Sequence, residues 1–75
     1  MSVALGIVGF GIMGERLLRA ALNHDASVIR PVAVWDPSPA AAVRLKEIAP
    51  GLPMLGSAAE VIAACDVLYI ASPPS

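Results

Sequence analysis

The chain has 75 residues, 57% of them hydrophobic, and its five basic and six acidic residues give a net charge of −1. Ordinary soluble domains have about 45–50% apolar residues. A domain this small has little volume for its surface, so its apolar fraction should be lower than that, not higher. Every apolar stretch is interrupted before the about 18–20 residues of a membrane span, no basic region precedes the first one as in a secretory signal, and no basic stripe exists to bind nucleic acid. The composition therefore predicts part of a larger core, with neither membrane nor nucleic acid as a partner.

The single cysteine, Cys65, leaves no disulfide framework and no pair of thiol ligands for a metal. This cysteine usage is typical of a reducing compartment. We therefore expect a cytoplasmic protein without a metal site.

The first two predicted elements flank a glycine-rich loop. Residues 3–8 are almost continuously apolar and predict a strand, and residues 11–23 have the periodicity of an amphipathic helix. Between them runs Gly9-Phe10-Gly11-Ile12-Met13-Gly14, a G-x-G-x-x-G sequence in the strand-to-helix context that binds the pyrophosphate of a dinucleotide. We expect Gly9 to permit a sharp turn, Gly11 to let the pyrophosphate approach the backbone, and Gly14 to let the helix pack closely on the sheet. The N–H groups and the dipole of the helix start complete an anion site.

The second predicted strand, residues 31–36, ends in an acid, Asp36. This carboxylate follows the last glycine by about 20 residues, the spacing at which an acid hydrogen-bonds the adenosine ribose. A 2′-phosphate there would meet like charge, and we expect Arg44, further along the chain, to lie too far away to offset it. The sequence thus predicts NAD as the cofactor, with NADP less favoured. The alternative is that Asp36 only begins a turn before the next helix.

Capping signals mark the next two helices. Ser38 as N-cap and Pro39 at the first helical position begin the second helix, and Pro50-Gly51 ends it. We expect its apolar stripe to include Ala42, Leu45, Ile48 and Ala49. Residues 54–55 allow only a short strand. Ser57 and Glu60 then form a capping box for a third helix that runs through Ala64.

The last predicted strand covers residues 67–71 and is stopped by Pro73-Pro74. The strands are apolar at successive positions, a pattern that predicts burial on both faces and hence a parallel sheet with helices on each side. Strands that alternate with helices predict an α/β fold with a doubly wound parallel sheet, the Rossmann NAD(P)-binding fold, with strand order 3-2-1-4. Residues 1–75 would then be the N-terminal part of a dinucleotide-binding domain.

Three segments, residues 6–14, 31–39 and 66–75, resemble the N-terminal domain of the Gfo/Idh/MocA oxidoreductases. The last of these, Asp-Val-Leu-Tyr-Ile-Ala-Ser-Pro-Pro-Ser, is similar to the family's strand that ends in Ala-Thr/Ser-Pro beside the cofactor. The resemblance implies an NAD(P)-dependent oxidoreductase that transfers hydride to or from a sugar, a polyol or a related small carbonyl or alcohol. It also implies that the catalytic lysine of a Glu-Lys-Pro motif and the substrate domain lie beyond Ser75. We further expect the full-length protein to be a homo-oligomer.

Ligands of an open parallel sheet lie beyond the carboxyl ends of its strands, and this rule selects the candidate site. His24 and Cys65 fall at the opposite end, and Tyr69 is expected to pack in the core. No catalytic residue is therefore assigned within the chain. The predicted cofactor-binding residues are Gly9, Phe10, Gly11, Ile12, Met13, Gly14, Asp36, Ala71, Ser72, Pro73 and Pro74.

Two other functions fit the same residues. Gly-Phe-Gly-Ile-Met-Gly is similar to the Gly-Leu-Gly-x-Met-Gly of the β-hydroxyacid dehydrogenases, although the long loop of residues 23–30 and the Ser-Pro-Pro ending favour the first family. A non-catalytic nucleotide-binding or redox-sensing module would have the same fold, since fold does not fix function.

Overall fold

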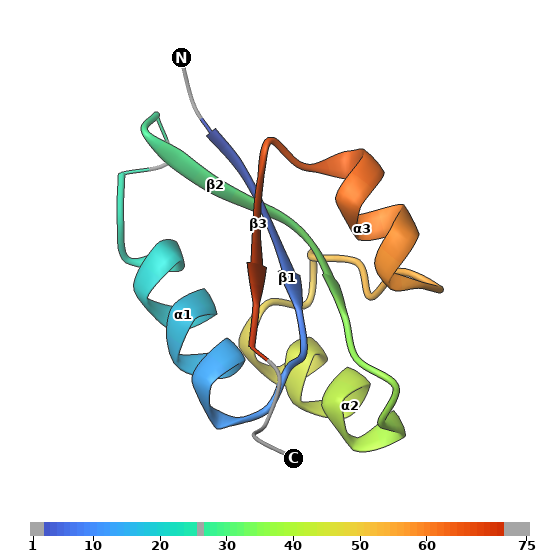
Figure 1. Ribbon diagram of the computed structural model, residues 1–75. Helices are drawn as coiled ribbons and strands as arrows, with labels where there is room; N and C mark the ends of the chain where they lie inside the picture. The colour runs from blue at the N-terminus through green and yellow to red at the C-terminus, as the bar shows by residue number, and fades with distance from the viewer. Residues whose placement is uncertain (1–2, 26, 72–75) are drawn as a thin grey trace.

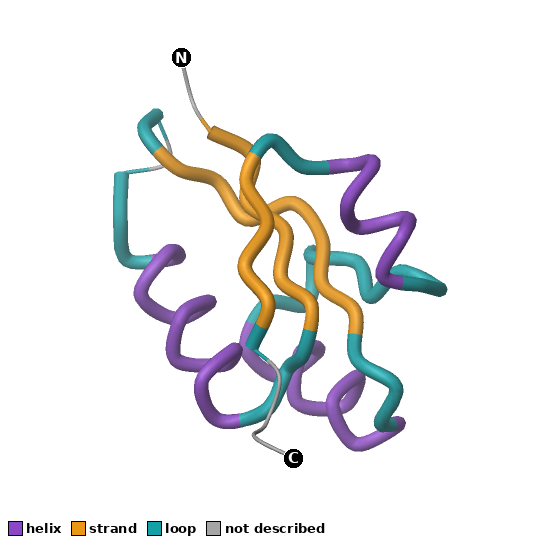
Figure 2. The backbone as a smooth tube through the Cα atoms, in the orientation of Figure 1, coloured by secondary structure: helices purple, strands orange, loops and turns teal. Residues whose placement is uncertain are grey.

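A computed structural model describes residues 3–25 and 27–71, which form a three-stranded parallel sheet with helices on both faces (Figure 1). The strands cross the centre of the molecule, with the helices to either side (Figure 2). The elements in chain order are β1 (Val3–Val8), α1 (Ile12–Leu22), β2 (Ile29–Trp35), α2 (Pro39–Ile48), α3 (Ala58–Ala64) and β3 (Val67–Ile70). This alternation confirms the predicted Rossmann-type α/β fold.

The strand order is β2-β1-β3, and both pairings of β1 are parallel. Beyond β2, Met54 makes an isolated parallel bridge to Val34, supported by a hydrogen bond of 2.9 Å from Leu55 N to Val34 O. The segment predicted as a short third strand is therefore reduced to one bridge. Its position beside β2 agrees with the expected 3-2-1-4 order.

The two faces of the sheet bury different helices because side chains alternate along a strand. Leu5, Ile7 and Val34 pack in one cluster with residues of α1 and α2, including Leu18 and Leu45. On the opposite face, α3 packs so closely on β1 that a Cβ placed on Gly6 would lie 2.7 Å from Val61 Cγ1. Small residues in β1 thus set the distance between α3 and the sheet.

Strand β2 begins two residues earlier than predicted, at Ile29 instead of Pro31. The register between β1 and β2 shifts between Leu5 and Gly6, which pair with Pro31 and Ala33. Proline has no N–H to donate to a ladder, and irregular positions of this kind are where a strand accommodates it. The proline therefore lies inside the strand and does not mark its start.

Burial on both faces holds for β1 but not for β3. Leu5, Gly6 and Ile7 are all buried, whereas Val67 and Ile70 in β3 are 50% and 61% exposed. The expectation of a strand buried on both faces is wrong for β3 in this structure. Among the described residues β3 is the edge of the sheet, and only β1 pairs with it.

The helix caps match the sequence in part. Ser57 Oγ accepts a hydrogen bond of 3.2 Å from Glu60 N, as the capping box predicts, while Glu60 reaches back to Gly56 N and not to Ser57 N. Ser38 is the N-cap of α2 by position but makes no side-chain capping bond. On α2 the buried alanine is Ala41, whereas Ala42, which was assigned to the apolar stripe, is exposed. The run of consecutive alanines does not show in the sequence which of them faces the core.

No helix among residues 3–25 and 27–71 is long and apolar enough to cross a membrane.

Candidate nucleotide-binding site

The loop after β1 turns sharply at Gly9. Its φ of +94° lies in the region that side chains disfavour, and a Cβ there would lie 2.5 Å from Ala71 O of the neighbouring strand segment. Gly9 N donates to Trp35 O at 2.8 Å, so the turn is also tied to β2. The first glycine is therefore required by both backbone angle and space.

The other two glycines of the loop differ in what surrounds them. A Cβ on Gly14 would overlap Gly9 O, and Ile7 Cγ2 would lie 3.5 Å away, so this glycine brings α1 against the end of β1. A Cβ on Gly11 would meet nothing within 4 Å. The protein itself therefore does not need glycine at position 11, and the open space there is available to a ligand.

Helix α1 begins directly behind this space. Its N-cap, Gly11, has no side chain that could cap the helix. The N–H groups of the first helical turn have no acceptor within the helix, and the helix dipole adds partial positive charge. The residues that carry two of these groups, Ile12 and Met13, are 75% and 58% exposed. The helix start is thus an accessible anion site of the kind that binds phosphate groups.

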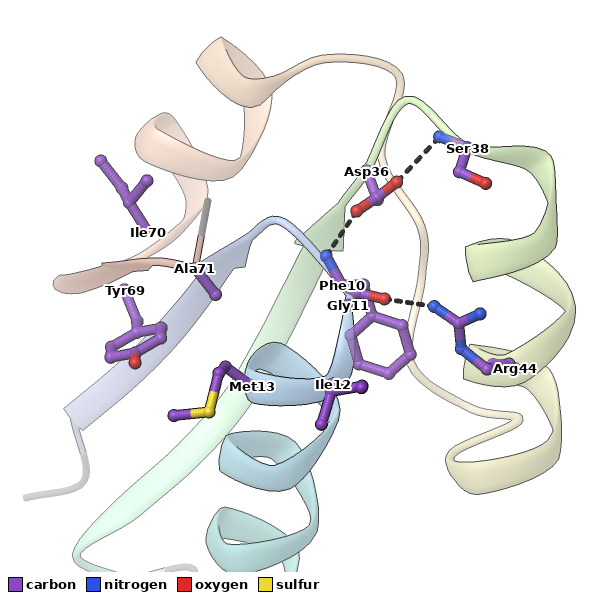
Figure 3. A pocket seen from close by; sticks show the side chains of 10 residues that line it. All are labelled: Phe10, Gly11, Ile12, Met13, Asp36, Ser38, Arg44, Tyr69, Ile70 and Ala71. Atoms are coloured by element: carbon purple, nitrogen blue, oxygen red, sulfur yellow. Dashed lines mark hydrogen bonds between the residues drawn. The ribbon is translucent and has the colours of Figure 1, made fainter. Parts of the chain in front are cut away.

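Asp36 comes directly after β2 and bonds two backbone groups. Its Oδ2 accepts a hydrogen bond of 2.6 Å from Phe10 N, and its Oδ1 accepts one of 2.8 Å from Ser38 N (Figure 3). The turn role considered as an alternative is therefore present, and it coexists with a position beside the glycine loop. Each carboxylate oxygen has a second lone pair with which it can accept a ligand hydroxyl.

Arg44, expected to lie too far away to offset a 2′-phosphate, lines the same groove as Asp36 and contacts the glycine loop. Its Nη2 donates a hydrogen bond of 2.6 Å to Phe10 O (Figure 3), and its Nε lies 3.5 Å from Glu15 Oε2. Arg44 is on α2, and the packing of Ala41 and Leu45 against the core turns this helix toward the loop. The place of Arg44 along α2 was a poor guide, because the contact that it makes is with the glycine loop, 34 residues earlier in the chain.

These groups line a groove of about 530 Å³ at the carboxyl ends of the strands (Figure 3). Tyr69 and Ile70 of β3 lie on the opposite side of the groove from Arg44 in Figure 3. Tyr69, expected in the core, is 37% exposed. Tyr69 and Ile70 point to opposite faces of the sheet and are both exposed, because β3 stands at the sheet edge, and no local pattern in the sequence shows which strand takes that place. The ten residues that line the groove are Phe10, Gly11, Ile12, Met13, Asp36, Ser38, Arg44, Tyr69, Ile70 and Ala71.

Most predicted site residues gather at this groove, in three different relations to it. Gly9 and Gly14 lie behind the lining and shape the loop. Phe10 has a fully buried side chain, and its backbone N–H and C=O at the groove are bonded to Asp36 and Arg44. Ala71 lines the groove, and its N–H donates to Val8 O at 2.8 Å. Ser72, Pro73 and Pro74 lie outside the described residues.

The titratable groups at the other end of the sheet are remote from the groove. Helix α1 has 11 residues, so His24, just past its end, lies about 16 Å from its start. Hydrogen bonds from the backbone and the side chain of Ser27 lower the pKa of Asp25 in the same loop. Among residues 3–25 and 27–71 no three histidine, cysteine, aspartate or glutamate side chains gather as metal ligands.

Comparison with known proteins assigns the chain to a family. The family model described as "Oxidoreductase family, NAD-binding Rossmann fold" matches residues 3–75. The chain belongs to the Gfo/Idh/MocA family. The glycine loop, the acid after β2 and the groove are therefore features of a Gfo/Idh/MocA chain. Of the two families that the sequence resembles, the match supports this one and not the β-hydroxyacid dehydrogenases.

A solved structure also resembles this Gfo/Idh/MocA chain. The crystal structure of an NAD-binding protein from Listeria innocua has a TM-score of 0.80 and 27% sequence identity over 97% of the chain. The chain spans about one fifth of the length of that protein, 21%. No curated protein matches the chain.

Proposed function

We propose that the chain is the dinucleotide-binding part of an NAD(H)-dependent oxidoreductase, with the glycine loop on the pyrophosphate and Asp36 on the adenosine ribose. The observation that carries the proposal is the combination at one groove of an accessible helix start and a carboxylate 2.6 Å from the loop backbone. The family match to an NAD-binding Rossmann fold supports it.

The residues present fit such a cofactor. The space above Gly11 is open where a pyrophosphate would approach, and the first turn of α1 offers N–H groups to its oxygens. The proposed contacts are the backbone of Gly11, Ile12 and Met13, the carboxylate of Asp36, and Ala71 at the end of β3. Gly9, Phe10 and Gly14 shape the loop, with both polar backbone groups of Phe10 already bonded to side chains of the protein. A bound nicotinamide supplies the hydride chemistry, and the protein supplies orientation.

The preference for NAD(H) over NADP(H) rests on charge. Asp36 would face a 2′-phosphate with like charge, which costs several kcal/mol in a partly buried site. Arg44 is the described cation that lines the groove, but its Nη2 is bonded to Phe10 O and its Nε faces Glu15. Because Glu15 lies beside this guanidinium and partly offsets its charge, we expect Arg44 to compensate a 2′-phosphate only in part.

The test is a titration of NADH and NADPH against the full-length protein and its Asp36→Ala variant. We expect the wild-type protein to favour NADH at least about tenfold, a difference of about 1.4 kcal/mol, and Asp36→Ala to remove most of that preference. Asp66→Ala is the matched control, since Asp66 also accepts a backbone hydrogen bond, from Ala4 N at 3.1 Å, but not at the groove. A wild-type preference for NADPH, or a preference that Asp36→Ala leaves unchanged, contradicts the role given to Asp36.

The rest of the reaction is proposed to depend on residues outside 1–75. The structurally similar protein is about five times as long, and β3 presents an exposed apolar edge that a further strand would cover. We therefore propose that 1–75 is the N-terminal part of a larger dinucleotide-binding domain, that proton transfer and substrate binding belong to other segments, and that the substrate is a sugar, a polyol or a related small carbonyl or alcohol. A screen of polyols with NAD on the full-length protein tests the substrate class. If the protein oxidises none of the polyols, the proposed substrate class is contradicted.

A further inference from the structure

Both polar backbone groups of Phe10, its N–H and its C=O, are hydrogen-bonded to charged side chains. Its N–H donates to Asp36 Oδ2 at 2.6 Å, and its carbonyl accepts from Arg44 Nη2 at 2.6 Å. The aromatic side chain is fully buried, so the residue cannot shift as a whole. The peptide groups on either side of Phe10 are therefore fixed in orientation by an acid and a base from the β2–α2 region.

The bond from Arg44 also determines how the next N–H is presented. The described peptide bonds are trans, and in a trans peptide the C=O and the following N–H point in opposite directions. Because Arg44 draws the Phe10 carbonyl toward α2, the N–H of Gly11 is turned away from α2. A loop that binds an anion must present N–H groups and keep its carbonyl oxygens away, since a carbonyl oxygen repels phosphate.

Arg44 is in turn oriented by the helix that the loop begins. Its Nε lies 3.5 Å from Glu15 Oε2, while Glu15 Oε1 binds Arg19 at 3.1 Å. Glu15 stands in the first turn of α1. Two arginines thus share one carboxylate, but Arg44 alone of the pair bonds to the glycine loop and lines the groove.

We infer that Arg44 is a positioning residue for the pyrophosphate site: it holds the Phe10 carbonyl away from the anion and so presents the Gly11 N–H to it. This inference rests on the proposed binding of a dinucleotide at the groove. The guanidinium acts through the loop backbone, so its effect extends to every ligand with the pyrophosphate and does not depend on a 2′-phosphate.

The experiment measures dissociation constants of ADP-ribose, NADH and NADPH for the full-length protein and for Arg44→Ala, Arg44→Lys and Arg19→Ala. A hydrogen bond to a charged group is the strong kind, so we expect Arg44→Ala to weaken ADP-ribose and NADH binding by about 10- to 100-fold. Lysine at position 44 keeps the charge and can donate to the same carbonyl, and we expect it to recover at least half of that loss on a logarithmic scale. Arg19→Ala removes the same charge from the same carboxylate and should change both constants less than about twofold.

Three outcomes overturn the inference. One is an Arg44→Ala loss no larger than that of Arg19→Ala. Another is a loss confined to NADPH, which would make Arg44 a ligand of the 2′-phosphate. The third is a failure of Arg44→Lys to recover binding although thermal unfolding shows it folded. If Arg44→Ala does not fold, the comparison of Arg44→Lys with Arg19→Ala decides, with Arg44→Lys expected to retain ADP-ribose binding within about tenfold of the wild-type protein.

A wild-type protein that binds neither ADP-ribose nor NADH refutes the proposed function itself. This result is distinguishable from the three outcomes that overturn the role of Arg44.

Discussion

The loops after β1 and β2 lie side by side at the groove, but they are built in different ways. The loop after β1, residues 9–11, takes its shape from the absence of side chains at Gly9 and, in the helix behind the loop, at Gly14. The loop after β2, residues 36–38, takes its shape from a side chain, since both carboxylate oxygens of Asp36 bond to backbone N–H groups. The first loop supplies room and N–H groups, and the second supplies charge.

The difference shows that one loop depends on the other. Phe10 N, in the first loop, is bonded to the acid of the second, and Phe10 O is bonded to Arg44 of the helix that follows the second. A loop of glycines has many accessible conformations, and the charged groups select one of them. Substitutions in and beside each loop can therefore distinguish residues that the stability of the fold requires from residues that ligand binding requires.

The largest effect is expected for Gly14→Val. Its side chain would overlap Gly9 O, and forced overpacking of this kind costs about 1–3 kcal/mol, here at the upper end because backbone must move. Denaturant unfolding of the full-length protein measures the loss of stability. Ala20→Val, at an exposed position of the same helix, should cost only about 0.5 kcal/mol in helix propensity. Equal losses for the two variants would mean that α1 does not depend on close contact with β1.

Gly11→Val is expected to have the opposite profile. A Cβ at this position meets nothing within 4 Å, and the backbone at φ −85° accepts a branched residue. Stability should therefore change by less than about 0.5 kcal/mol, while the valine occupies the space proposed for the pyrophosphate and weakens NADH binding by at least about tenfold. Calorimetric titration with NADH, alongside unfolding, checks both parts. Unchanged affinity would remove the pyrophosphate from this position.

The smallest effect is expected for Ser38→Ala in the second loop. Ser38 makes no side-chain capping bond, so its loss should cost less than about 0.5 kcal/mol. Ser57→Ala is the comparison, because Ser57 Oγ accepts from Glu60 N at 3.2 Å and a lost cap of that kind costs about 1 kcal/mol. Thermal unfolding of both variants gives the order, and a larger loss for Ser38→Ala would show that its hydroxyl caps α2 in solution.

Local backbone demands explain what could be predicted from the sequence. A glycine at a sharp turn, an acid at a strand end and a Ser-x-x-Glu cap each have a meaning within a few residues, and Gly9, Asp36 and Ser57 stand where such rules place them. The part of the strand order that the structure shows, β2-β1-β3, followed from the alternation of elements and their handed crossovers.

The features that escaped prediction depend on contacts between distant segments. Arg44 reaches the loop because α2 packs on the same face of the sheet as α1, and no local pattern contains that information. The exposure of Tyr69 depends on which strand stands at the sheet edge. Pro31 misled the boundary of β2 because a proline signals a strand start only where the ladder is regular.

The parallel pairing of β1 with both neighbours has a consequence for how the chain folds. Bonds across the sheet close large loops: Phe10 to Asp36 spans 26 residues, and Ala4 to Asp66 spans 62. During synthesis β1 leaves the ribosome before β2 and well before β3, so its pairing on both sides is completed only when β3 has been made. Non-local closure of this kind slows folding and prolongs exposure to aggregation. Newly made chains are therefore expected to depend on chaperones in the interval before β3 emerges.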